Sequence, residues 1–165
     1  MPILRAGAFE MFSNSPEQTR RLGMQLGGLL KNGDLICLEG ELGSGKTTLV
    51  QGIAAGWGSR EAATSPTFVL VNVYRRPDDT RLAHVDAYRL ESAAQADALD
   101  IDLLLEEGPV AVEWAQKIES ALPEERLWLK LFWVDDERRR IEVSPQGEHY
   151  LPMAAALQET VFGLV

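Results

Sequence analysis

The sequence of 165 residues is poor in cysteine and lacks any long apolar run. Cys37 is its only cysteine, so no disulfide can form within the chain, and the simplest role for this residue is a small part of the core. No stretch approaches the roughly 18 consecutive apolar residues that a membrane helix needs. The N-terminal MPILRAGAFEMF also lacks the long apolar region of a secretory signal. These absences predict a cytoplasmic protein with no membrane contact.

Repeats, low-complexity tracts and linker-like segments are also missing from the sequence. Hydrophobic residues at 45% and charged residues at 25% are ordinary values for a globular domain. The length is enough for one compact core and short for two. We therefore expect a single domain over residues 1–165.

Basic residues are scarce in the second part of the chain, and the net charge is −9. Residues 1–60 contain six Lys or Arg and five Asp or Glu, whereas residues 61–165 contain ten and twenty. The segment 91–107 has six acids and no base. Because nucleic-acid binding depends on Lys and Arg that replace counterions, such binding by the chain itself is not expected. The acidic segment is either a solvated surface, which is the simpler interpretation, or a docking surface for a basic protein.

The pattern of apolar residues predicts strands that alternate with helices. The pair Ser15-Pro16 is typical of a helix start, and this helix is expected to end at Asn32-Gly33. Further helices are expected at 47–55, within 92–107 and over much of 151–162, and strands at 35–39, 67–74, 81–86 and 109–114, with a hairpin of strands at 127–134 and 140–144. The predicted fold class is α/β, with a mainly parallel sheet, helices on both faces and an added antiparallel hairpin.

Residues 40–48 read GELGSGKTT and match G-x-x-x-x-G-K-[ST], the phosphate-binding loop pattern. Glycines permit positive φ angles, so successive backbone N–H groups can turn inward around an anion, and the following helix adds its N-terminal dipole. Lys46 would supply charge to the β- and γ-phosphates, and the Thr47 hydroxyl would bind Mg²⁺. The loop predicts a P-loop NTPase-like fold, in which the nucleotide-binding residues are Gly40, Leu42, Gly43, Ser44, Gly45, Lys46, Thr47 and Thr48.

The loop pattern leaves the base and the reaction open. A guanine-specific domain usually carries an Asn-Lys-x-Asp run, which is missing here, so ATP is the expected nucleotide, with Mg²⁺. The Leu-Ser-Gly-Gly-Gln run of transporter ATPases is missing as well. Three activities remain: ATP hydrolysis, phosphate transfer by a small-molecule kinase, and nucleotide sensing without catalysis.

Two acids stand at the ends of apolar strands and could complete the site. Asp86 ends Leu82-Ala83-His84-Val85-Asp86, and Glu113 ends Val110-Ala111-Val112-Glu113. One could hold the metal while the other orients the attacking water; alternatively each acid only caps its strand or pairs with Arg89 or Lys117. The residues alone do not assign these roles.

Other candidate residues surround these acids in the sequence. The segment Thr64-Ser65-Pro66-Thr67 is either a switch that senses the γ-phosphate, with Thr67 near the nucleotide, or a simple connection. Trp114 is either a wall of the nucleotide site or a core residue. His84, within an apolar strand, is interpreted as a structural histidine.

The motifs GELGSGKTT, TSPTF, HVDAYRL and VEW, in this order and at these spacings, resemble those of the bacterial TsaE family. The resemblance covers nearly the whole chain. It implies an ATPase that is weak alone and acts with TsaB and TsaD in forming threonylcarbamoyladenosine on tRNA. On this basis tRNA is contacted only indirectly, through the complex, and ATP hydrolysis drives or resets a conformational cycle.

The resemblance also implies roles for individual residues. Residues 43–48 would bind phosphates, Thr47 and Glu113 would hold Mg²⁺, and Asp86 matches the family's essential aspartate. The catalytic residues expected are thus Asp86 and Lys46, and the metal site is expected among Thr47, Glu113 and Asp86. The pairs Ser15-Pro16 and Glu137-Arg138 would flank the adenosine. Phe68 and Ala115 stand where family members often have tyrosine and proline, so a hydroxyl role at residue 68 is not expected.

Overall fold

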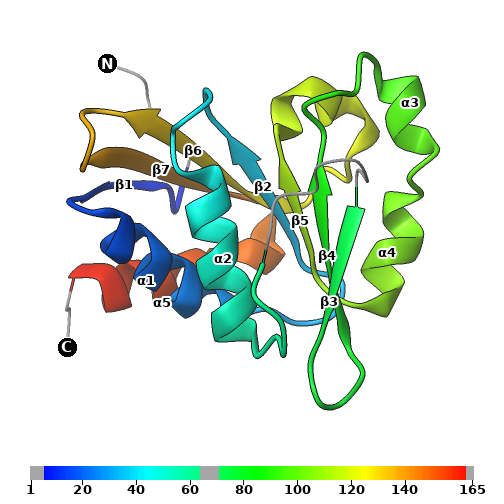
Figure 1. Ribbon diagram of the computed structural model, residues 1–165, viewed down its shortest axis with the longest axis horizontal. Helices are drawn as coiled ribbons and strands as arrows, with labels where there is room; N and C mark the ends of the chain where they lie inside the picture. The colour runs from blue at the N-terminus through cyan, green and yellow to red at the C-terminus, as the bar shows by residue number, and fades with distance from the viewer. Residues whose placement is uncertain (1–5, 64–70, 163–165) are drawn as a thin grey trace.

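A seven-stranded sheet with the order β1-β7-β6-β2-β5-β4-β3 organises the computed structural model, which describes residues 6–63 and 71–162 (Figure 1). Its centre is parallel, because β2 pairs in parallel with β6 and with β5, and β5 pairs in parallel with β4. Both edges are antiparallel, with β7 and β1 on one side and β3 on the other. The strands are β1 Phe9–Ser13, β2 Leu35–Glu39, β3 Val71–Arg75, β4 Arg81–Asp86, β5 Val110–Glu113, β6 Arg126–Trp133 and β7 Arg139–Gln146.

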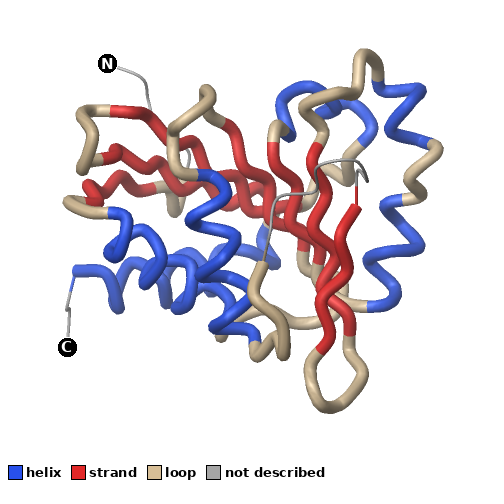
Figure 2. Tube along the Cα trace, viewed as in Figure 1, coloured by secondary structure: helices blue, strands red, loops and turns tan. Residues whose placement is uncertain are grey.

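Helices cover both faces of this sheet, as Figure 2 shows for the blue and red segments. Alternate residues of β2 point to opposite sides: Ile36 and Leu38 are buried with α1, α2 and α5, whereas Leu35 and Cys37 are buried with α3, α4 and η1. The helices are α1 Pro16–Gly27, α2 Lys46–Trp57, α3 Ala93–Asp97, α4 Ile101–Glu107 and α5 Leu151–Phe162, with the 3₁₀ segments η1 Ala115–Ala121 and η2 Glu148–Tyr150. The prediction of an α/β fold with a parallel core and an added hairpin is confirmed.

Helices α1 and α2 pack closely because glycines line their contact. A Cβ atom at Gly52 would lie 2.0 Å from the carbonyl oxygen of Arg20, and one at Gly23 would lie 2.3 Å from that of Leu49. Larger residues would therefore push the helices apart. Since α2 begins at the glycine-rich loop, this contact fixes the loop's helix against the core.

Helix α1 ends at Gly27, so the expectation that it continues to Asn32-Gly33 is wrong. After Gly27 the backbone hydrogen bonds reach back three residues and not four: Leu29 N–H donates to the carbonyl oxygen of Leu26, and Leu30 N–H to that of Gly27. Two successive glycines explain the end, because each costs about 1 kcal/mol relative to alanine in a helix. Leu30 is nevertheless buried, as its apolar spacing suggested.

The other predicted elements agree well with the observed ones. Strands β2 and β4 and helix α5 have the predicted bounds, and β6 and β7 form the expected hairpin. The helical region 92–107 is divided into α3 and α4 at Asp100, whose φ is 51° and whose side chain caps α4. Strand β1 was not predicted. The expected strand at 67–74 is seen from residue 71, and its residues 67–70 lie outside the described residues.

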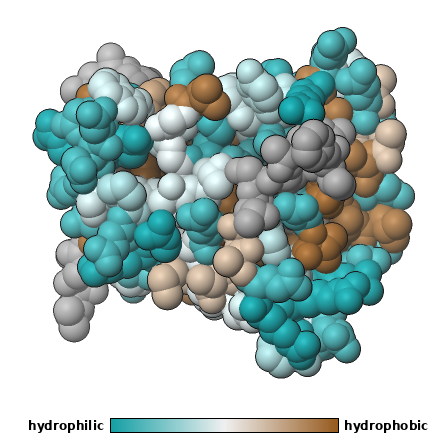
Figure 3. All heavy atoms as spheres, viewed as in Figure 1, coloured by the Kyte–Doolittle hydropathy of each residue, from teal (hydrophilic) through white to brown (hydrophobic). Residues whose placement is uncertain are grey.

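Polar residues cover much of the surface in the view of Figure 3, with an apolar patch near α4 at the right. Leu103 of α4 is half exposed and follows Asp102 in the sequence. Within residues 6–63 and 71–162, no helix combines the length and apolar character needed to cross a bilayer.

Candidate functional site

The glycine-rich loop connects β2, in the middle of the parallel part of the sheet, to the N-terminus of α2. Gly43 has a φ of 80°, and Gly45, the N-cap of α2, has a φ of 102°. Residues with a side chain rarely adopt these left-handed backbone conformations, so the loop needs glycine at both positions. A Cβ at Gly43 would meet nothing within 4 Å, which leaves open space in front of the loop. The first N–H groups of α2 therefore border a space that suits an anion.

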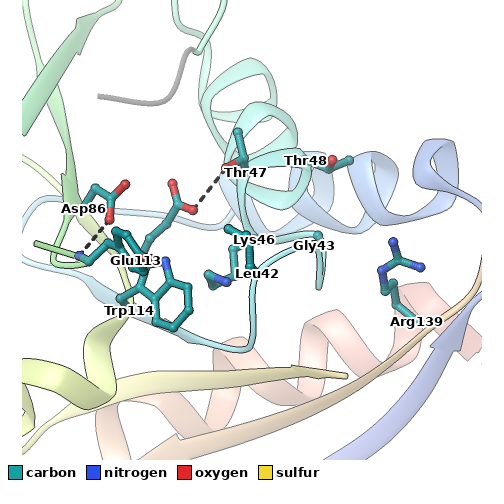
Figure 4. A pocket seen from close by; sticks show the side chains of 11 residues that line it. Leu42, Gly43, Lys46, Thr47, Thr48, Asp86, Glu113, Trp114 and Arg139 are labelled. Carbon is teal, nitrogen blue, oxygen red and sulfur yellow. Dashed lines mark hydrogen bonds between the residues drawn. The ribbon is translucent and has the colours of Figure 1, made fainter. Parts of the chain in front are cut away.

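A pocket of about 340 Å³ opens at this loop (Figure 4). Its walls come from the loop and α2, from the ends of β4 and β5, and from the start of β7. The lining residues are Leu42, Gly43, Gly45, Lys46, Thr47, Thr48, Asp86, Tyr88, Glu113, Trp114 and Arg139.

Lys46 lies folded against its own loop. Its Nζ donates hydrogen bonds to the carbonyl oxygens of Gly40, at 2.6 Å, and Glu41, at 2.9 Å. It also lies 4.2 Å from the centre of the Trp114 ring, a cation–π distance. Burial lowers the pKa of Lys46, and the nearby carboxylates of Glu113 and Asp86 oppose that shift. The lysine charge is thus held at the pocket wall by contacts that phosphate oxygens could replace.

Asp86 and Glu113 stand side by side because they are paired residues of the parallel strands β4 and β5. Glu113 is buried, and its Oε1 accepts a hydrogen bond from the Thr47 hydroxyl at 3.1 Å. Asp86 Oδ1 accepts a hydrogen bond from the N–H of Tyr88 at 2.9 Å. Burial, with a contribution from Glu113, raises the pKa of Asp86, while the Tyr88 N–H opposes the shift. Both acids occupy the carboxyl edge of the sheet, where open α/β sheets bind ligands.

The oxygens at this edge fit a magnesium ion. Thr47 and Glu113 together offer a hydroxyl and a carboxylate, which are the hard ligands that Mg²⁺ prefers. In the described part of the chain, no three His, Cys, Asp or Glu side chains gather to hold a metal by themselves. A Mg²⁺ ion at this edge would take its other ligands from phosphate and water, as is usual for this ion.

The hairpin contributes an arginine that sequence reasoning missed. Arg139 lines the pocket, and its Nε is buried with no hydrogen-bond partner among the described residues. Its Nη1 donates to the carbonyl oxygens of Asp135 and Arg138. Arg138, named from the sequence, points elsewhere and pairs with Asp135 at 2.7 Å. Three arginines follow one another here, and alternation along β7 turns only Arg139 toward the loop.

The remaining expected residues occupy three kinds of place. Pro16 and Glu137 border a small second pocket beside Gly45 and Thr48, while Ser15 caps α1 by accepting a hydrogen bond from Gln18 N–H. Gly40 and Ser44 belong to the loop but do not line the main pocket, and they lie close together, since a Cβ at Gly40 would come 2.4 Å from Ser44 Oγ. Thr67, like the proposed switch 64–67, lies outside the described residues.

Comparison with known proteins identifies the family. The family described as threonylcarbamoyl adenosine biosynthesis protein TsaE matches residues 13–141. The chain belongs to the TsaE family. This match confirms the TsaE resemblance that the four sequence motifs indicated.

Relatives of this TsaE-family chain match over most of their length. The tRNA threonylcarbamoyladenosine biosynthesis protein TsaE of Streptomyces coelicolor is 42% identical over 137 residues, which cover 79% of this chain and 93% of the relative. The TsaE protein of Bacillus subtilis is 36% identical over 136 residues, with 82% and 85% covered. The crystal structure of Bacillus subtilis YdiB is similar in fold, with a TM-score of 0.77 and 30% identity, and the match covers 97% of this chain and 99% of that one.

Proposed function

We propose that this TsaE-family chain is a Mg²⁺-dependent ATPase that serves tRNA threonylcarbamoyladenosine biosynthesis. One observation carries the proposal: the phosphate-loop lysine, Lys46, and two strand-end carboxylates, Asp86 and Glu113, line a single pocket at the N-terminus of α2. The names of the relatives supply the pathway. ATP is favoured over GTP because the guanine-reading Asn-Lys-x-Asp run is missing from the sequence.

Each group has a distinct task in this mechanism. The N–H groups of the loop and the Lys46 ammonium bind and orient the phosphates, and Thr47 with Glu113 would hold Mg²⁺. When bound, the ion neutralises charge on the phosphates. Asp86 uses Oδ1 to accept the Tyr88 N–H, so Oδ2 is the oxygen that can accept a hydrogen bond from the attacking water. Asp86 thereby orients the water toward the γ-phosphate.

The partners in this proposal are TsaB and TsaD, with tRNA contacted through them. The net charge of −9 supports an indirect role, because an acidic surface repels the tRNA backbone. A cytoplasmic location follows from the same pathway.

The test is phosphate release from ATP by the pure chain, alone and with TsaB and TsaD, for the wild type and Asp86→Asn. The variant should bind ATP within about threefold of the wild type and release phosphate at least about tenfold more slowly, because orienting groups contribute at that scale or above. Asp79→Asn, in an exposed turn with a positive φ that asparagine tolerates, is the matched control and should behave as the wild type.

Three results would contradict the proposal in different ways. Equal hydrolysis by Asp86→Asn and the wild type would remove Asp86 from the mechanism. Phosphate transfer to an added acceptor, faster than hydrolysis, would favour a kinase. ATP binding with no phosphate release, even with both partners present, would favour a nucleotide sensor.

A further inference from the structure

A chain of buried polar side chains leads away from the pocket and into the sheet. Glu113 accepts the Thr47 hydroxyl at Oε1, and its other oxygen, Oε2, lies 2.5 Å from His84 Nε2. His84 Nδ1 in turn lies 3.0 Å from the Tyr74 hydroxyl. The exposed fractions of Tyr74, His84 and Glu113 are 3%, 0% and 3%, so water does not replace these contacts. Four side chains thus connect the edge strand β3 to the phosphate loop.

Strand register explains how these residues meet. His84 is paired with Ala111 across β4 and β5, and Glu113 lies two residues beyond Ala111 on the same face. Tyr74, on β3, likewise lies two residues from Asn72, the partner of His84. Diagonal neighbours of this kind are within reach of long and aromatic side chains.

Hydrogen-bond chemistry sets the direction of the contacts at the carboxylate. An ionised carboxylate only accepts, so His84 Nε2 carries the hydrogen and donates a hydrogen bond to Glu113. A neutral ring then accepts at Nδ1, and the Tyr74 hydroxyl can donate to it. With Oε2 held by His84, the carboxylate cannot rotate freely, and Oε1 remains turned toward Thr47 and the pocket.

We propose that His84 and Tyr74 are positioning residues that hold the Glu113 carboxylate in the orientation from which Glu113 and Thr47 serve Mg²⁺. This inference rests on the proposed function and adds two residues to it. Neither residue lines the pocket, so both act through Glu113. Groups that orient a metal ligand typically contribute 10–100-fold to metal affinity.

The competing explanation is that these buried groups only satisfy one another's hydrogen bonds. In that case their loss would lower stability and leave the magnesium dependence unchanged. The same chain offers matched controls at the opposite end of β2, where His149 Nε2 lies 2.8 Å from buried Asp34 and the Tyr150 hydroxyl accepts the N–H of Leu35 at 2.8 Å. The first contact is again a histidine–carboxylate pair, although His149 is mostly exposed, and the second again involves a tyrosine hydroxyl; both lie at the end of β2 away from the loop.

The quantity to measure is the magnesium ratio: the affinity for ADP or ATP in the presence of Mg²⁺ divided by the affinity in the presence of EDTA. Calorimetry gives both affinities without any need for hydrolysis. His84→Leu should reduce this ratio by about tenfold or more. His84→Gln keeps an N–H donor near the position of Nε2 and should restore most of the ratio. Tyr74→Phe, which removes one hydroxyl, should reduce it by about two- to threefold. His149→Leu and Tyr150→Phe should lower the melting temperature and leave the ratio unchanged.

A double variant locates the effect at Glu113. In a Glu113→Ala background, His84→Leu should cause no further loss of the ratio, because residues that act as a unit are not additive. Additive losses would overturn the inference. If His84→Leu does not fold, as its melting curve would reveal, Tyr74→Phe decides: a ratio equal to the wild type in folded Tyr74→Phe overturns the inference.

Failure of the inference is distinguishable from failure of the proposed function. A wild type that binds ATP and ADP equally well with Mg²⁺ and with EDTA contradicts the function and the inference together. A wild type with a clear magnesium effect that persists in folded His84→Leu contradicts only the inference.

Discussion

Replacing Arg139 with alanine would test the contribution of the hairpin to nucleotide binding. The Arg139 side chain lies against the N-cap of α2, since an ideal Cβ at Gly45 would be 3.8 Å from its Cγ and Nε. Its Nε is buried without a hydrogen-bond partner in the described part of the protein, although Nη1 is anchored to Asp135 and Arg138. A donor held in this way beside a helix N-terminus suits a phosphate oxygen of the nucleotide.

The size of the effect follows from one charged hydrogen bond. Such a bond contributes about 1.5–3 kcal/mol, and about 1.4 kcal/mol corresponds to a tenfold change in affinity. Arg139→Ala should therefore weaken ATP binding by about 10–100-fold. Arg138→Ala is the matched control, because the Arg138–Asp135 pair is exposed and such pairs contribute little. We expect a change of less than about threefold for this variant.

Calorimetry with ATP, ADP and adenosine would locate the contact. Arg139→Ala should lose affinity for ATP and ADP and keep its affinity for adenosine, while Arg139→Lys should recover only part of the loss because lysine lacks the guanidinium geometry. Melting curves would show that the hairpin anchor at Asp135 is not the cause. ATP affinity within threefold of the wild type in Arg139→Ala, or an equal loss in Arg138→Ala, would refute the reasoning.

Other perturbations have equally definite outcomes. Lys46→Ala should weaken ATP binding by about 10–100-fold through loss of a charged hydrogen-bond donor, and wild-type affinity and turnover in that variant would contradict the phosphate-loop assignment. Burial raises the pKa of Cys37 to about 12, so the thiol remains protonated at pH 8, and an alkylating reagent should label it only after denaturation. Rapid labelling of the folded protein would contradict this burial. The substitutions Asp97→Asn and Asp102→Asn, on the acidic segment 91–107, should slow association with TsaB and TsaD at low salt and have less effect at high salt. Binding kinetics at two ionic strengths would measure this, and equal association rates would leave the segment as a solvated surface.

The local sequence determined the elements on which the phosphate site stands. The short apolar run before the glycines predicted a buried strand, and the glycines with the following lysine and threonine indicated a strand–loop–helix unit. These signals lie within about 20 consecutive residues and depend on backbone preferences that act locally. For the same reason β2, β4 and α5 were predicted with the observed bounds.

Only the tertiary structure decided which distant residues meet at the site. Asp86 and Glu113 were expected at one sheet edge, but their direct pairing, and the contact of Glu113 with Thr47, depend on the order and register of β4 and β5. His84 was interpreted as a structural histidine because a lone histidine in an apolar strand carries no sign of its neighbours. The diagonal contact with Glu113 reveals its link to the pocket.

The hairpin and the edge strand β1 also could not be predicted fully from the sequence. Arg138 and Arg139 are adjacent and chemically identical in the sequence, and only the pairing of β7 with β6 and β1 turns Arg139 toward the loop. Strand β1 was missed because a five-residue edge strand gains most of its stability from its partner. Backbone preference is a property of neighbouring residues, whereas strand order and register arise from contacts between segments far apart in the chain, so a single sequence specifies the first locally and the second only through folding.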